Sequence, residues 1–446
     1  MFKTFMFLLI ALFLPMNSFC EESIFFYSGD QSNQTEITSI KESDAPVAGF
    51  MANLLCRVGD DAELFFCEDL LRNGMFTGQT QPKKKQSINL FAQVTTAADL
   101  DPARLREFGE RFKFALMSFP FSQEVNLLRE KNPSLPVYIF SNPYFGFGDK
   151  FWGTPEVREQ AIQDYALRLA NGDIIYYNNE AVMNIGNPQW QDYFAAQARK
   201  HTDLAGATGI FLDTTSNDLP NFATGPGFEV PGNYVDAATW AGYNLTFTNK
   251  VVEAMGSKKV GSNSGSRGPG QAGPIPDADI RALTAFTSVE AFGLDLPFDT
   301  SAAESSWYFF ETVFADMVLL SQTKPVIMEV VGTTDDEQLR LYALCAFLLI
   351  QNDNTFFYYT TPQDQLGAVS WFPEWGAQIG NPVGGFLYDD ETGILSREFE
   401  NGLVLVNVID ATIEAQHDGN YINWDGTPVT FPISLPAFTG KLLLKN

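Results

Sequence analysis

Between about residue 87 and residue 378, short apolar runs alternate with longer stretches of helical spacing. Runs rich in β-branched and aromatic residues predict buried strands, and apolar residues that recur every three or four positions predict amphipathic helices. Eight strands are predicted, at 88–94, 114–119, 137–141, 209–213, 259–263, 286–290, 325–330 and 355–360. Helices are predicted between them, at 102–111, 123–131, 155–170, 188–201, 237–255, 303–322 and 335–351.

Helix starts support this division. A side chain that can cap a helix, followed by proline at the first helical position, satisfies free backbone N–H groups where a helix begins. An acidic stretch at 334–337 predicts a similar start for the last helix. The three pairs are Asp101-Pro102, Thr154-Pro155 and Asn187-Pro188.

Regular alternation of strands and helices implies a parallel sheet, and eight strands over about 290 residues suit a closed (β/α)8 TIM barrel. The rival is an open, doubly wound sheet, which usually carries a glycine-rich phosphate loop after its first strand. No glycine follows the first predicted strand, at 95–98. The glycine-rich stretch 261–268 leads into prolines rather than into a helix. Residues 87–378 are therefore expected to form the barrel.

The segments on either side of the predicted barrel have different sequence patterns. Residues 1–20 combine an early lysine, a short apolar run and small residues near position 20, which is typical of a cleaved secretory signal peptide; lipid attachment at Cys20 is the alternative. Residues 21–86 have no assignable fold. Residues 379–446 predict a small antiparallel β-sandwich domain, with strands at 385–388, 402–408, 411–415 and 440–444. The expected location is secreted or periplasmic.

Composition narrows the chemistry. The chain has 54 Asp and Glu against 28 Lys and Arg, a formal net charge of −26. Nucleic acids and anionic membranes are therefore poor partners, because both need clustered positive charge. The only histidines, His201 and His417, lie in unpromising contexts for a zinc centre or a catalytic triad. Carboxylates are thus the expected acid and base groups, with no cofactor and no metal, and the oligomeric state stays open.

The cysteines add one open question. In an exported chain, Cys56 and Cys67 are close enough in sequence to form a disulfide, but the sequence does not decide whether they do. Cys345 lies within an apolar helix and is expected to be a buried free thiol.

Two carboxylates stand where a barrel enzyme carries its chemistry. Catalytic groups of such barrels lie at the carboxyl ends of the strands, and Asp213 and Glu290 end two apolar strands. Glycoside hydrolysis needs two carboxylates that flank one bond. The alternatives are that Asp213 only caps a turn, and that Glu290 only pairs with an arginine such as Arg281 or Arg267.

Other residues near strand ends are candidates for binding sugar. Aromatic side chains suit the apolar faces of pyranoses, and amides suit their hydroxyl groups. The alternative for the aromatic residues is packing of loops over the rim. The substrate-binding candidates are Asn142, Tyr144, Trp152, Asn178, Asn263, Glu329 and Trp371.

A family resemblance rests on three stretches. They are the asparagine-proline start at 187–188 with its following helix, the sequence Gly-Ile-Phe-Leu-Asp at 209–213, and the tail Arg-Glu-Phe-Glu-Asn-Gly-Leu-Val-Leu-Val-Asn at 397–407. Together they resemble a family of glycoside-hydrolase-like TIM-barrel proteins with a C-terminal β domain, similar to polygalactosaminidase-type and α-amylase-like barrels. The resemblance covers roughly 87–446. It implies that Asp213 is the key carboxylate or nucleophile and that Glu290 is the acid/base.

The sequence thus predicts an exported glycoside hydrolase that cleaves O-glycosidic bonds of a polysaccharide or glycan with two carboxylates. The alternative is a non-catalytic carbohydrate-binding protein on a TIM-barrel scaffold. A metal-dependent hydrolase is a third hypothesis, which only unspecific acidic groups such as 389–391 support. The sugar, the linkage, and endo or exo attack stay open.

Overall fold

The computed structural model describes only part of the chain. Its described residues are 23–27, 34–38, 88–94, 101–118, 122–145, 151, 153–169, 171–177, 180–213, 237–264, 277–289, 314–361, 370–389 and 391–446.

The chain divides into two compact units, Met1–Thr80 and Gln81–Asn446. In the first unit, strands β1 (Ser23–Tyr27) and β2 (Gln34–Thr38) pair antiparallel. The predicted signal peptide at 1–20, and Cys56 and Cys67, lie outside the described residues. No helix in the described segments is both long and apolar enough to cross a membrane.

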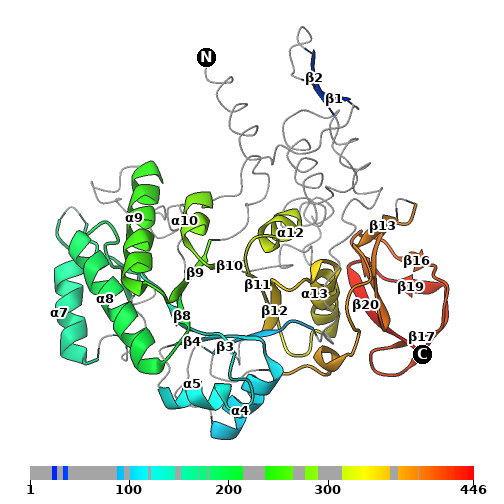
Figure 1. The fold of residues 1–446 in the computed structure, drawn as a ribbon, viewed down its shortest axis with the longest axis horizontal. Helices are drawn as coiled ribbons and strands as arrows, with labels where there is room; N and C mark the ends of the chain where they lie inside the picture. Colours follow the sequence, from blue (N-terminus) through cyan, green and yellow to red (C-terminus); the bar gives the residue numbers. More distant parts are fainter. Residues whose placement is uncertain are drawn as a thin grey trace. The chain divides into compact units, whose positions relative to one another are not determined.

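The second unit contains an eight-stranded parallel barrel (Figure 1). The strands follow one another around the sheet in chain order, each paired in parallel with the next. Leu90 forms a parallel bridge with Phe357 of the last strand, and the Phe357 N–H donates to the Asn89 carbonyl at 2.8 Å, so the sheet closes on itself. This closure confirms the predicted barrel and excludes the open sheet. The strands are β3 (Phe91–Val94), β4 (Phe114–Ser118), β5 (Val137–Ser141), β8 (Gly209–Leu212), β9 (Lys259–Asn263), β10 (Phe286–Val289), β11 (Val326–Val331) and β12 (Thr355–Thr360).

The three predicted cap-and-proline starts are confirmed. The Asp101 carboxylate accepts from Ala103 N–H at 2.7 Å, and Thr154 and Asn187 accept from the second or third N–H of their helices. Asp336 caps the last barrel helix. The helices are α4 (Pro102–Arg111), α5 (Ser122–Arg129), α7 (Pro155–Tyr165), α8 (Pro188–Ala205), α9 (Ala237–Met255), α10 (Ala278–Leu283), α12 (Ala315–Ser321) and α13 (Glu337–Ile350).

The predicted helix at 155–170 is too long. Helix α7 stops at Tyr165. Ala166 and Arg168 then form antiparallel bridges with Met183 and Ile174, and the short strands β6 (Tyr176–Tyr177) and β7 (Glu180–Ala181) pair with each other. The Leu167 N–H donates to the Val182 carbonyl at 2.7 Å, which ends the helical hydrogen bonding. Leu167 and Val182 are buried in one apolar cluster with Trp240 of α9, so tertiary packing overrides the local helical spacing.

The structure also departs from the prediction at helices α8 and α10. Helix α8 continues beyond the predicted end at 201 to Ala205, where Gly206 adopts the left-handed conformation (φ 67°) that terminates it. The short helix α10 was not predicted, because its six residues give too little periodicity to recognise.

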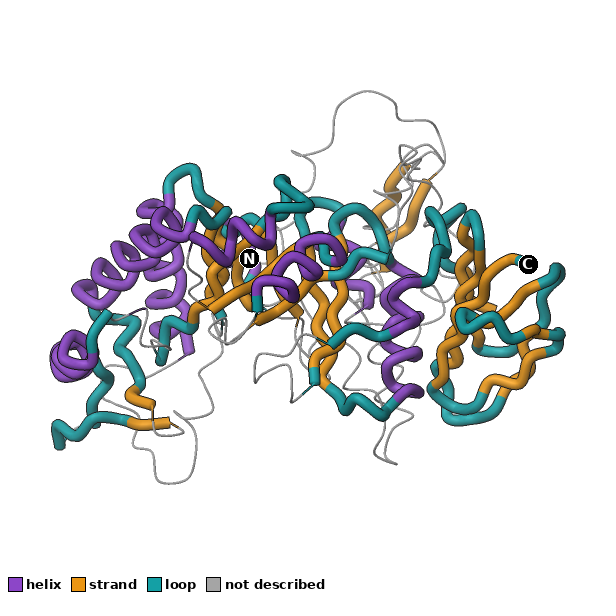
Figure 2. The backbone as a smooth tube through the Cα atoms, turned by 90° about the horizontal axis from the view of Figure 1, so that it is seen from below, coloured by secondary structure: helices purple, strands orange, loops and turns teal. Residues whose placement is uncertain are grey.

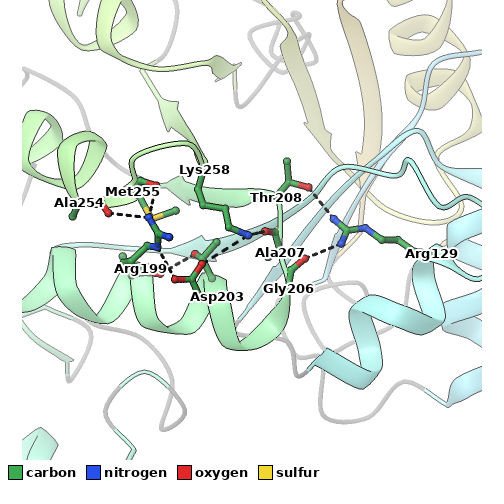
Figure 3. A network of polar contacts seen from close by, with 11 residues as sticks. Arg129, Arg199, Asp203, Gly206, Ala207, Thr208, Ala254, Met255 and Lys258 are labelled. Carbon is green, nitrogen blue, oxygen red and sulfur yellow. Dashed lines mark hydrogen bonds and ion pairs between the residues drawn. The ribbon is translucent and has the colours of Figure 1, made fainter.

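Basic side chains tie together the amino-terminal end of the barrel (Figure 3). Arg129 donates to the Gly206 carbonyl at 2.8 Å and to the Thr208 hydroxyl at 2.9 Å, just before β8 begins. Lys258 donates to the Ala207 carbonyl at 2.7 Å. These contacts hold the start of β8, the strand that leads to Asp213, on the side of the barrel that serves stability rather than catalysis.

The C-terminal residues form two antiparallel sheets, seen as orange strands near the C-terminus in Figure 2. A buried cluster takes Leu405 and Leu443 from the larger sheet and Ala415 and Leu435 from the smaller one, so the sheets face each other as the predicted sandwich. The larger sheet has the order β13 (Leu387–Asp389), β14 (Ile394–Phe399), β15 (Gly402–Asn407), β20 (Thr439–Lys445), β17 (Tyr421–Asn423) and β18 (Pro428–Val429), and the smaller pairs β16 (Ile413–Ala415) with β19 (Ile433–Leu435).

Candidate active site

Ring contacts between distant strands identify the interior of the barrel. The ring centroids of Phe114, on β4, and Phe286, on β10, are 4.9 Å apart, although four strand pairings separate the two strands in the sheet. Such rings can meet only inside the barrel. Burial also raises the pKa of Tyr138 to about 12, so its hydroxyl stays neutral. We call this layer the aromatic floor; its members are Phe114, Tyr138, Phe211, Phe286 and Phe356.

Strand alternation then places three polar residues above the aromatic floor. Side chains two residues apart in a strand lie on the same face. Asp213 follows Phe211 by two residues, and Asn142 follows Tyr138 by four. Asn263 stands two residues beyond Gly261, which pairs with Phe211. All three therefore lie on the inward side at the carboxyl ends of β5, β8 and β9.

The structure joins these three residues by hydrogen bonds. The Asn142 Nδ2 donates to Asp213 Oδ2 at 3.1 Å, and the Asn263 Nδ2 donates to Asp213 Oδ1 at 3.0 Å. The Asp213 backbone N–H donates to the Ser141 carbonyl at 2.9 Å. We call Asn142 and Asn263 the amide clamp. The carboxylate of Asp213, which is partly exposed, thus has a donor from each neighbouring strand.

Tyr144 does not occupy the sugar-binding position that its sequence context suggested. Its side chain is fully buried, and its hydroxyl donates to Asn244 Oδ1 of α9 at 2.7 Å. Its ring stacks on Trp240, also of α9, with centroids 5.4 Å apart. Its backbone N–H donates to Asn142 Oδ1 at 2.9 Å. Tyr144 therefore holds Asn142 of the amide clamp and presents no surface to a ligand.

Asn244 carries no signal in the sequence that would mark it as part of the site. It lies 100 residues from Tyr144, in the middle of a helix, where an isolated asparagine has no distinguishing pattern. Only the packing of α9 against the loop after β5 brings the two side chains together.

Glu329 lies on β11 and is 6% exposed. It stands two residues beyond Ile327, which pairs with Ser288, and Ser288 follows the inward-facing Phe286 by two residues. The alternation therefore places Glu329 on the inward face of the barrel, as the sequence suggested. Three other candidates, Glu290, Trp152 and Asn178, lie outside the described residues.

Trp371 is not brought to this cluster. Its ring packs edge-on against Phe112 with centroids 6.0 Å apart, and the Arg111 guanidinium lies 4.3 Å from its centroid. Because α4 leads from the carboxyl end of β3 to the amino end of β4, its last residue, Arg111, lies at the opposite end of the barrel from Asp213. Trp371 therefore packs against the end of α4 and is not part of the cluster around Asp213.

The described part of the chain holds no group of three or more His, Cys, Asp or Glu side chains suited to a metal ion. His201 has a structural role. Its half-buried ring contacts the Phe151 carbonyl at 3.2 Å and stacks on the Phe151 ring. Cys345 is buried and free, as predicted.

Residues 131–403, more than half of the chain, match the family described as Hypothetical glycosyl hydrolase family 15. The chain belongs to this family. The matched region runs from just before β5 into β15 and includes Asn142, Asp213 and Asn263. Membership makes the chain a glycoside hydrolase by family and implies a carbohydrate substrate. No curated protein matches the chain.

Solved glycoside hydrolases are among the structures to which the chain is similar. The glycoside hydrolase domain of PelA from Pseudomonas aeruginosa is 15% identical over 64% of this chain and 98% of its own, with a TM-score of 0.41. A maltogenic α-amylase, AmyB, from Thermotoga neapolitana is 9% identical over 80% of this chain and 96% of its own, with a TM-score of 0.46.

Proposed function

We propose that this chain is an exported glycoside hydrolase that cleaves O-glycosidic bonds of a polysaccharide or glycan with two carboxylates. The observation that carries the proposal is the Asp213 carboxylate at the barrel mouth, held by one amide donor from each neighbouring strand. Family membership supports a glycan substrate. The signal-like residues 1–20 support export.

Asp213 serves in this proposal as the nucleophile. One of its oxygens attacks the anomeric carbon as the bond to the leaving oxygen breaks, and a glycosyl ester forms. Glu290, which directly follows β10 in the sequence, protonates the leaving oxygen. It then takes a proton from the water that releases the sugar, so the anomeric configuration is retained. A separation of about 5–5.5 Å between the two carboxyl groups would support this route, whereas about 6.5–9.5 Å would indicate inversion.

The test is a screen of the purified chain against neutral and amino-sugar polysaccharides, with reducing ends as the readout. Asp213→Asn and Glu290→Gln should each lower kcat by at least about 10³-fold on any glycan that the wild type cleaves. Asp203→Asn is the matched control, because Asp203 pairs with Arg199 at the amino-terminal end of the barrel. The activity of this variant should stay within about twofold of the wild type.

Full activity of both Asp213→Asn and Glu290→Gln would refute the two-carboxylate mechanism. Binding of a glycan by the wild type without any release of reducing ends would favour the alternative, a non-catalytic carbohydrate-binding protein.

A further inference from the structure

We infer that Asn142 and Asn263 are positioning residues that orient the Asp213 carboxylate, and that they are not sugar-binding groups. This inference rests on the proposed role of Asp213. Each amide donates to a different carboxylate oxygen, at 3.1 and 3.0 Å, from opposite sides of β8. The terminal torsion of an aspartate is otherwise broad, so two opposed donors select one orientation of the carboxylate plane.

Asn142 is itself held in one orientation. Its Oδ1 accepts from the Tyr144 N–H at 2.9 Å, so its NH2 group points to Asp213. Asn142 is only 3% exposed, which leaves almost no surface for a sugar hydroxyl. Tyr144 is in turn anchored to α9 by the bond to Asn244, so α9 is linked to the Asp213 carboxylate through Asn244, Tyr144 and Asn142.

Asn263 is anchored through its chain neighbours. The hydroxyls of Ser262 and Ser264 are buried and lie 3.1 Å apart. Ser262 also contacts Thr284 at 3.0 Å, and Ser264 contacts Thr287 of β10 at 2.8 Å. These bonds fix the backbone on both sides of Asn263, so its amide approaches Asp213 from a rigid strand end.

The kinetic signature follows from this arrangement. A residue that only orients the nucleophile contributes to the chemical step and hardly to substrate binding, so its loss lowers kcat and leaves KM nearly unchanged. A residue that binds sugar raises KM when it is removed. Because both amides act on one carboxylate, the effects of their removal should not multiply.

The first experiment measures kcat and KM of Asn142→Ala, Asn263→Ala and the double variant on the polysaccharide that the wild type cleaves. We expect each single variant to lose about 10²-fold in kcat with KM within about threefold, and the double variant to lose less than the product. Asn171→Ala is the control, because Asn171 also donates to an aspartate, Asp173, at 2.7 Å but on an exposed turn. A large rise in KM with unchanged kcat would overturn the inference.

Asn142→Asp separates the donor role from a structural one. An aspartate at 142 can still accept from the Tyr144 N–H, but it cannot donate to Asp213. A kcat loss at least as large as that of Asn142→Ala is expected. Wild-type kcat in Asn142→Asp would show that only the Tyr144 contact matters and would overturn the inference.

A second measurement needs no activity. Asn142→Asp sets two carboxylates side by side and should lower Tm by about 2–4 °C, and adding Asp213→Asn should restore Tm because an amide again faces a carboxylate. Additive losses in the double variant would overturn the inference even if no glycan is cleaved. Unchanged turnover of Asp213→Asn, together with restored Tm, would instead refute the proposed function and leave the amide–carboxylate contact standing.

Discussion

At the residue scale, one glycine makes room for the aromatic floor. Gly261 lies on the inward face of β9, and a Cβ atom at this position would lie 2.0 Å from Cζ of Phe286. The Phe286 ring therefore occupies the volume that any side chain at 261 would need. Asn263 of the amide clamp stands only two residues further along the same strand.

Gly261→Ala should consequently displace the Phe286 ring and lower the free energy of unfolding by about 1–3 kcal/mol, which thermal or denaturant unfolding would measure. Gly242→Ala is the control, since Gly242 is in helix α9 and, apart from the backbone of that helix and the two neighbouring residues, no heavy atom lies within 4 Å of the position that its Cβ would take. Alanine there should stabilise the chain by up to about 1 kcal/mol. If Gly261→Ala and Gly242→Ala change the free energy of unfolding equally, the Phe286 ring does not occupy the space beside Gly261.

At the element scale, helix α13 joins the barrel to the β domain. The Arg397 guanidinium, on β14, donates to the carbonyls of Leu348, Leu349 and Gln351 at 2.8–3.1 Å, where α13 ends. A cation that bonds the last carbonyls of a helix satisfies groups that have no partner within the helix. Gly440 of β20 also lies on α13, because a Cβ there would be 2.7 Å from Cβ of Cys345.

Arg397→Lys should lower the free energy of unfolding by about 2–3 kcal/mol, because one ammonium cannot serve both the α13 carbonyls, which Nη1 contacts, and the Gly384 carbonyl, to which Nε donates at 2.9 Å. Arg168→Lys is matched to it, since Arg168 also donates to main-chain carbonyls, those of Gln163 and Gly172, but on the surface. A loss below about 0.5 kcal/mol is expected there. If thermal unfolding shows equal losses of stability for the two variants, the contacts of Arg397 with the end of α13 stabilise the chain no more than those of a surface arginine.

At the scale of the whole molecule, the net charge gives an expectation for the substrate class. A formal net charge of −26 produces a field that repels polyanionic glycans and attracts cationic ones. The proposed site adds the Asp213 carboxylate, and Glu329 lies on the same inward face. A neutral or amino-sugar polymer is thus the expected substrate class.

This expectation predicts a salt dependence. For a partly de-N-acetylated amino-sugar polymer, KM should rise about threefold or more when ionic strength increases from about 10 to 300 mM, because salt screens the attraction. KM for the fully acetylated, neutral polymer should hardly change, which makes it the control. Preferential hydrolysis of a polyuronate over both polymers would contradict the charge argument.

Parts of the site were predictable and parts were not. Asp213, Asn142 and Asn263 end or follow apolar strands, and the carboxyl ends of parallel strands meet at one rim, so the sequence predicted that they share a site. The role of the amides was not predictable, because it depends on which atoms face each other across β8. Tyr144 and Trp371 were misplaced for the same reason: whether an aromatic residue near a strand end faces a ligand or packs against a helix depends on contacts with distant segments.

The sequence by itself determined the alternation of strands and helices, the capped helix starts and hence the class of fold, because periodicity and capping are properties of neighbouring residues. Only the tertiary structure decided that the Leu90–Phe357 bridge closes the barrel, that α7 yields to a local β segment, and that Tyr144 rests on Asn244. Each of these depends on residues far apart in the chain, whose pairing is selected by burial and hydrogen bonding in the folded molecule.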